Sequence, residues 1–145
     1  MSDLYLALGL TVIAINLIAG ALGGLAWQKH RVSMPFWYLL RAAQLATLVF
    51  VIFECVLYAQ GHRSEDDLHY LYVFLPVVAS LFAEAVRGAS ASQELGEVDF
   101  KTLSEAKQQE VGMAIVRRET GVMTVAVFVV AFLVWRALET TVGMF

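Results

Sequence analysis

Four long apolar blocks constrain this chain more than any other feature of its sequence. They cover residues 4–27, 36–58, 69–86 and 121–138. A helix that spans a bilayer needs about 20 predominantly apolar residues, so each block is of the required size. Of the 145 residues, 59% are hydrophobic and 16% are charged, whereas soluble domains average about 45–50% and about 25%. The sequence therefore predicts an all-α integral membrane protein, a single domain with four transmembrane helices.

Short connections and the placement of basic residues predict the topology. The first two connections are brief, which makes successive helices antiparallel neighbours in a bundle. Lys29 and Arg31 lie in the first connection, and five more basic residues lie in the third, residues 87–120, whereas the second is acidic. Basic connections tend to stay on the cytoplasmic side. We therefore expect both termini to face outward, across a membrane of the bacterial cytoplasmic type.

The third connection is long enough to contain its own structure. It opens with the small residues GASAS, which suggest a linker, and Thr102 and Glu105 then have the spacing of a capping box. We expect a cytoplasmic helix that starts near Leu103. This helix either stays solvated, lies at the membrane surface or runs directly into the fourth block.

Polar side chains recur every three or four residues on the second and third blocks. Such spacing places them on one helix face. The second block carries Trp37, Arg41, Gln44, Thr47, Glu54 and Tyr58, and the third carries His69, Tyr72, Ser80, Glu84 and Arg87. Ionisable groups within a membrane are costly and usually face the bundle interior with a partner. The two helices are therefore expected to turn these faces toward each other.

Depth in the membrane suggests which groups form pairs. Arg41 and Glu84 lie at similar distances from the cytoplasmic ends of their helices, so we predict an ion pair between them. Glu54 and Arg136 lie at similar distances from the outer ends of the second and fourth helices, which predicts a second pair. Arg136 could instead extend to the outer surface beside Glu139. Each pair either locks the bundle or lines a site for a ligand, a proton or an ion.

The first helix has features of a close-packing seam. Gly20 and Gly24 form a GxxxG motif, and Asn16 lies one turn before it. Small residues allow helix backbones to approach closely, and asparagine can hydrogen-bond across the contact. The seam is predicted to pack within the protomer, with a homodimer as the alternative.

The histidines were considered as ligands. His62, His69 and Asp66 lie near the second connection, where imidazole and carboxylate groups could bind a divalent metal. One of the histidines could also serve as an axial haem ligand, although no second inward histidine is evident. Cys55, the single cysteine, lies among apolar neighbours, where a thiol is inert. No metal or haem is favoured on these grounds.

Function is only weakly constrained by the sequence. No phosphate-binding loop, nucleophile motif or metalloprotease motif is present, and no basic patch indicates nucleic-acid binding. We therefore expect a non-enzymatic membrane protein, either an accessory or structural subunit of a larger membrane complex or a self-associating module. The alternative is a subunit that binds or transports a small molecule, a proton or an ion, or that holds a redox cofactor. That site would use the polar face between the second and third helices.

Overall fold

The computed structural model describes residues 2–96 and 99–145. Within them the chain forms four long α-helices: α1 (Ser2–Gln28), α2 (Met34–Ala59), α3 (His69–Leu95) and α4 (Glu105–Glu139). A short 3₁₀ turn, η1 (Phe100–Thr102), precedes α4. All four helices are long and apolar enough to cross a membrane, as the sequence predicts.

Local chemistry explains where the first helices end and begin. His30 follows α1 with a φ of 52°, a left-handed conformation that histidine adopts more readily than most residues. Ser33 then caps α2, because its hydroxyl accepts a hydrogen bond from the Phe36 N–H at 3.3 Å. Pro35 lies in the first turn of α2, where a missing N–H costs little. Gly61, with a φ of 90°, turns the chain after α2.

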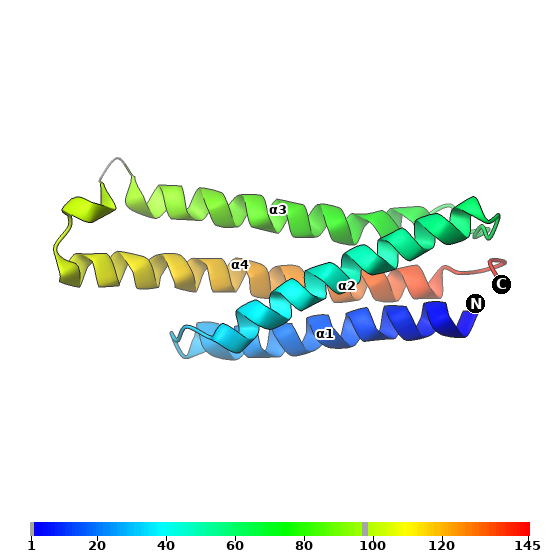
Figure 1. Cartoon of the computed structure of the whole chain (residues 1–145), viewed down its shortest axis with the longest axis horizontal. Helices are drawn as coiled ribbons and strands as arrows, with labels where there is room; N and C mark the ends of the chain where they lie inside the picture. Colours follow the sequence, from blue (N-terminus) through cyan, green and yellow to red (C-terminus); the bar gives the residue numbers. More distant parts are fainter. Residues whose placement is uncertain (1, 97–98) are drawn as a thin grey trace.

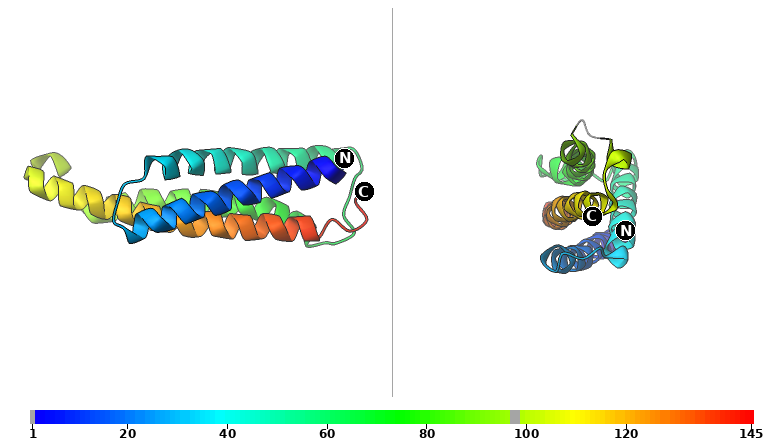
Figure 2. Two further views of the ribbon diagram at one scale, coloured as in Figure 1. Left: turned by 90° about the horizontal axis from the view of Figure 1, so that it is seen from below. Right: turned by 90° about the vertical axis from the view of Figure 1, so that its left-hand side faces the viewer.

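Three helices form a layer and the fourth crosses it. Figure 1 shows α4 between α1 and α3, with α2 running diagonally from the end of α1 towards the beginning of α3. The end-on view in Figure 2 shows the same layer with α2 along one side. Consecutive helices are antiparallel, and both termini lie at one end of the bundle (Figure 1). We call this end the acidic end, because it also carries the connection with Glu65, and the opposite end the basic end.

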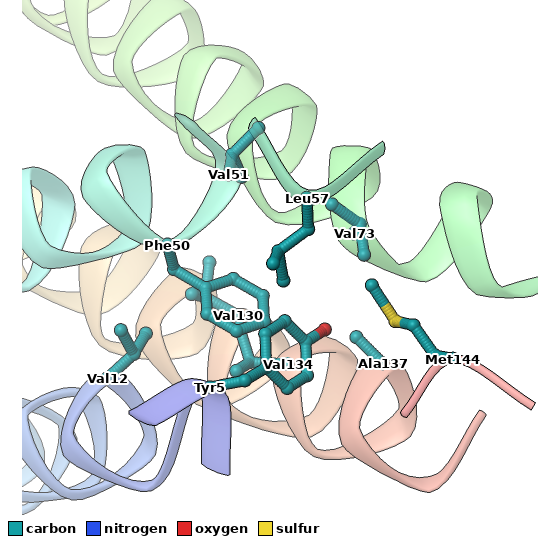
Figure 3. Packing of buried hydrophobic residues seen from close by; sticks show 10 residues of the cluster. All are labelled: Tyr5, Val12, Phe50, Val51, Leu57, Val73, Val130, Val134, Ala137 and Met144. Atoms are coloured by element: carbon teal, nitrogen blue, oxygen red, sulfur yellow. The ribbon is translucent and has the colours of Figure 1, made fainter. Parts of the chain in front are cut away.

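The buried core draws on every long helix. Figure 3 shows Tyr5 and Phe50 in contact near the acidic end, with valines of α3 and α4 beside them. Their rings lie 5.3 Å apart between centroids. Met144, beyond the end of α4, completes this cluster. A second cluster around Phe36, Leu40 and Met123 fills the bundle toward the basic end.

The outer surface of the bundle is apolar as well. Large hydrophobic side chains are exposed along each helix, including Leu10, Leu45, Phe82 and Val125. Soluble monomers rarely expose apolar patches of more than a few hundred Å². The exposed surface of the helices is therefore an apolar surface of the kind that lipid would cover.

Two helix boundaries differ from those predicted. The helix α3 continues through the small-residue segment to Leu95, because serine and alanine tolerate helical geometry when no proline or paired glycines interrupt them. The helix α4 begins at Glu105, after Ser104, and continues without interruption to Glu139. Thr102 does not cap this helix, since its hydroxyl donates to the carbonyl of Asp99 at 2.7 Å. The third connection therefore consists mostly of extensions of the two helices.

Candidate functional site

A buried polar triad connects three parts of the chain at the acidic end. The His69 Nε2 atom lies 3.1 Å from the Glu54 Oε1 atom, and His69 Nδ1 lies 3.1 Å from the Thr140 hydroxyl. The side chains of His69 and Glu54 are 0% and 1% exposed. Glu54 comes from α2, His69 opens α3 and Thr140 follows α4. The triad therefore ties together three elements that are distant in the sequence.

Thr140 influences which nitrogen of His69 carries a proton. A hydroxyl group has a single hydrogen to donate. The Thr140 hydroxyl lies 3.0 Å from the Arg136 carbonyl and 3.1 Å from the Ala137 carbonyl, and a carbonyl can only accept. When its hydrogen points to either backbone carbonyl, its oxygen can accept a hydrogen bond from His69. This arrangement favours the tautomer of His69 that carries a proton on Nδ1.

The contact between His69 and Glu54 then contains one further proton. If Glu54 is ionised, Nε2 must carry that proton and donate it; if His69 is neutral, the carboxyl group must carry it and donate to Nε2. Without the proton, a carboxylate would face a nitrogen lone pair in a fully buried site. A second extra proton would leave an unpaired buried cation, which is costly. The geometry of the contact is therefore suited to one proton shared between the carboxyl group and Nε2.

Two unpaired groups and a cavity adjoin this site. The Glu54 Oε2 atom and the Tyr5 hydroxyl are buried and have no hydrogen-bond partner among the described residues. Tyr5 reaches the site from α1 and lies close enough to Glu54 to interact with it electrostatically. Glu54 also lines a cavity of about 340 Å³, together with Tyr58 and Tyr70. Buried polar atoms without partners are rare in folded proteins, and the simplest partner for each of these two groups is the other, since Tyr5 lies near enough to interact with the Glu54 carboxyl group.

The connection between α2 and α3 holds His69 in place. The Asp66 carboxylate accepts the Leu68 N–H at 2.9 Å, directly before α3. The Ser64 hydroxyl donates to the Thr140 carbonyl at 2.5 Å, and the Glu65 N–H donates to the Val142 carbonyl at 2.9 Å. The connection is thus fastened to the segment after α4, which covers the triad.

A second polar cluster lies in the basic half of the bundle and includes the predicted Arg41–Glu84 ion pair. Arg41 Nη1 donates to Glu84 Oε1 at 2.6 Å, and it also donates to the Gln44 side-chain oxygen at 2.6 Å. Gln44 in turn donates to Glu84 at 2.9 Å. Arg87 donates to the other oxygen of Glu84 at 2.8 Å and lies 3.8 Å from Glu119. The matched depth of Arg41 and Glu84 was sufficient to predict their contact.

The cluster borders an open groove between α2 and α3. This groove has a volume of about 300 Å³ and is lined by Arg41, Gln44, Thr47, Ser80 and Glu84 among others. The Ser80 hydroxyl donates to the Pro76 carbonyl at 2.9 Å, within its own helix. The predicted polar faces of α2 and α3 therefore do meet, although Arg41 remains half exposed.

The predicted pair between Glu54 and Arg136 is wrong. Arg136 forms its ion pair with Glu139, one turn further along α4, and its guanidinium lies 5.4 Å from the centroid of the Tyr72 ring. Equal depth did not make the two side chains face each other, because α2 crosses α4 at an angle and Arg136 points toward α3. His69 occupies the position beside Glu54 instead. His69 also opens α3 at the same end of the bundle, and this match in depth could have revealed it from the sequence.

The glycine seam of α1 packs against α4 within the protomer. A Cβ atom at Gly20 would lie 2.7 Å from the Phe128 ring, and one at Gly23 would lie 2.6 Å from the Phe36 ring. At Gly24 the nearest atom would be 3.9 Å away, so Gly23 makes the close contact that the motif assigned to Gly24. Asn16 is buried, and its amide donates to the Val12 carbonyl at 2.9 Å. The predicted contact of Asn16 across the seam is replaced by one within α1.

The side chains considered as metal ligands do not converge. His69 faces Glu54 and Thr140, Asp66 accepts the Leu68 N–H just before α3, and the His62 ring lies 6.0 Å from the Phe145 ring between centroids. Among the described residues, no group of three or more histidine, cysteine, aspartate or glutamate side chains is close enough to hold a metal ion. Cys55 lies on the exposed side of α2 and lines the cavity next to Glu54.

Comparison with known proteins does not place this chain in a family. No family model, curated protein or solved structure matches it.

Proposed function

We propose that this chain is an integral membrane protein that binds and releases a proton at the Glu54–His69 pair. The observation that supports the proposal is the fully buried contact between the Glu54 carboxyl group and the His69 imidazole, which is suited to share one proton. The sequence predicts a site for a proton, an ion or a small molecule between α2 and α3, and in this proposal the bound species is a proton. Intramembrane ionisable groups commonly serve proton relays in pumps and transporters.

The surroundings of the pair favour exchange over permanent burial. Glu54 borders the 340 Å³ cavity, and its second oxygen has no partner in the described part of the chain. A proton that leaves the pair would change its charge, and the cost of that buried charge would favour movement of the covering segment. Proton binding would thereby be coupled to a structural change at the acidic end. Such coupling is the elementary step of a proton-driven transporter subunit.

Nitrogen-15 NMR of labelled histidines, together with carbon-13 NMR of labelled glutamate carboxyl groups, tests this proposal in lipid nanodiscs. We expect the Nε2 signal of His69 to change with pH in one step together with the Glu54 carboxyl signal. Glu54→Gln should abolish that shared step. The signals of His30, exposed at the basic end, should be the same in both proteins and serve as the internal control. A His69 titration that is unaffected by Glu54→Gln would contradict the proposal.

A structural or accessory subunit is the second candidate, and the Arg41 cluster favours it. Both oxygens of Glu84 accept hydrogen bonds from Arg41, Gln44 and Arg87, which is the arrangement of a lock between α2 and α3. Apolar replacement of a buried ion pair is often neutral or stabilising. Arg41→Met with Glu84→Leu should therefore preserve the fold and any co-purifying partner if the cluster is a lock. Loss of proton binding at Glu54 in that variant would instead connect the two clusters functionally.

A further inference from the structure

An open apolar groove lies between α3 and α4. It has a volume of about 550 Å³, within the range of about 300–1,000 Å³ that is typical of small-molecule sites. Four small residues leave space in the groove, and larger apolar side chains line the rest of it. The small residues are Ala79, Ala83, Gly121 and Ala126. None of the described residues that line it belongs to α2. The groove is therefore separate from both polar clusters.

One end of the groove is basic and aromatic. Trp27 and Arg118 line it there, and the Trp27 indole nitrogen would lie 3.1 Å from a Cβ atom at Gly121. Trp27 also lines a small neighbouring cavity, together with His30, Arg31 and Arg117. An apolar groove thus ends at a tryptophan of α1 that lies beside basic side chains from the connection after α1 and from α4.

We propose that this groove binds an anionic phospholipid, with an acyl chain between α3 and α4 and its phosphate beside Arg117 and Arg118. Tryptophan is enriched at the headgroup level of membranes, which places Trp27 at the depth of the phosphate. Basic pockets between transmembrane helices suit anionic headgroups. In a bilayer an empty apolar groove would leave unfilled space, and an acyl chain between α3 and α4 would fill it. The inference depends on insertion in a membrane and is independent of the proton site.

Quenching of tryptophan fluorescence by brominated lipids tests the lipid site. In Trp37→Phe with Trp135→Phe, only Trp27 emits. We expect brominated phosphatidylglycerol to quench Trp27 at least twofold more than brominated phosphatidylcholine does at the same mole fraction. A matched variant with Trp27→Phe and Trp37→Phe retains Trp135, which is exposed on α4 toward the acidic end; the two lipids should quench Trp135 equally.

Two further variants separate the headgroup from the groove. Arg117→Gln with Arg118→Gln should reduce the preference of Trp27 for phosphatidylglycerol to unity and leave Trp135 unchanged. Ala79→Phe should fill the groove and lower Trp27 quenching by both lipids. Equal quenching of Trp27 by the two lipids in the parent protein would overturn the proposal. Persistence of the preference after both arginine substitutions would overturn the assignment of the headgroup site.

Discussion

The Thr140 hydroxyl is the hydrogen-bond partner of His69 Nδ1 in the buried triad. When its hydrogen is engaged by a backbone carbonyl of α4, its oxygen can accept from His69. An alanine or valine at this position would remove that acceptor. A donor on Nδ1 of His69 would then be buried without its partner.

Thr140→Val should destabilise the protein by about 1–3 kcal/mol, the usual cost of leaving a buried donor unsatisfied. Unfolding in detergent, followed by circular dichroism, measures the change in the free energy of unfolding. Thr141→Val is the matched control, because the Thr141 hydroxyl donates only to the Leu138 carbonyl in its own turn. Equal effects of the two substitutions would show that the hydrogen bond to His69 does not contribute.

The sequence predicts some contacts between polar side chains but not others. Arg41 and Glu84 were predictable because regular helix geometry fixes both their depth and the face on which they lie. The predicted partner of Glu54 was wrong because depth and face do not determine the angle at which α2 crosses α4. Thr140 was not foreseen either, since it lies just beyond the last helix and its contact with His69 depends on how α3 packs against α4.

The contact between α1 and α4 depends on the absence of side chains at particular glycines. Gly23 lies against the Phe36 ring and Thr124, whereas one residue later Gly24 has space for a methyl group. Two adjacent glycines on the same helix therefore differ in packing but share nearly the same backbone context. Substitutions at the two glycines can therefore distinguish the effect of packing on stability from the effect of helix propensity.

Gly24→Ala should stabilise the protein by up to about 1 kcal/mol, because alanine favours helix over glycine. Gly23→Ala gains the same propensity but overpacks the interface, which typically costs about 1–3 kcal/mol; the net effect should be destabilising. Thermal unfolding of the two variants in one detergent makes the comparison. If both variants are equally stable, the close approach at Gly23 does not limit packing.

At the level of helices, the sequence predicted the number and type of elements but not all of their limits. Long apolar blocks fixed the existence of α1, α2, α3 and α4. The small-residue segment at residues 88–92 is predicted to be a linker, but it lies within α3 because nothing in it breaks a helix. Thr102 and Glu105 have capping-box spacing, but Thr102 lies within a 3₁₀ turn and the helix starts after Ser104.

The molecule as a whole has charged groups concentrated at its two ends and an apolar surface between them. The acidic end carries Glu65 and Asp67, whereas the basic end carries Lys29, Arg31 and Arg117. Since basic connections are retained in the cytoplasm, this distribution predicts that the acidic end, and with it the Glu54–His69 site, faces outward. The proposed lipid site would then lie in the inner leaflet.

Cysteine labelling in intact cells tests this orientation. In a Cys55→Ala background, Gln60→Cys places a thiol on an exposed residue at the acidic end, and Ser92→Cys places one on an exposed residue of the α3 extension at the basic end. A membrane-impermeant maleimide should label position 60 and leave position 92 unlabelled until the membrane is permeabilised. Gln60 is preferable to Ser64 in the same connection, because the Ser64 hydroxyl binds the Thr140 carbonyl and its replacement would disturb the triad. Labelling of position 92 but not 60 in intact cells would reverse the orientation and place the proton site on the cytoplasmic side. Labelling of both positions in intact cells would contradict a fixed topology.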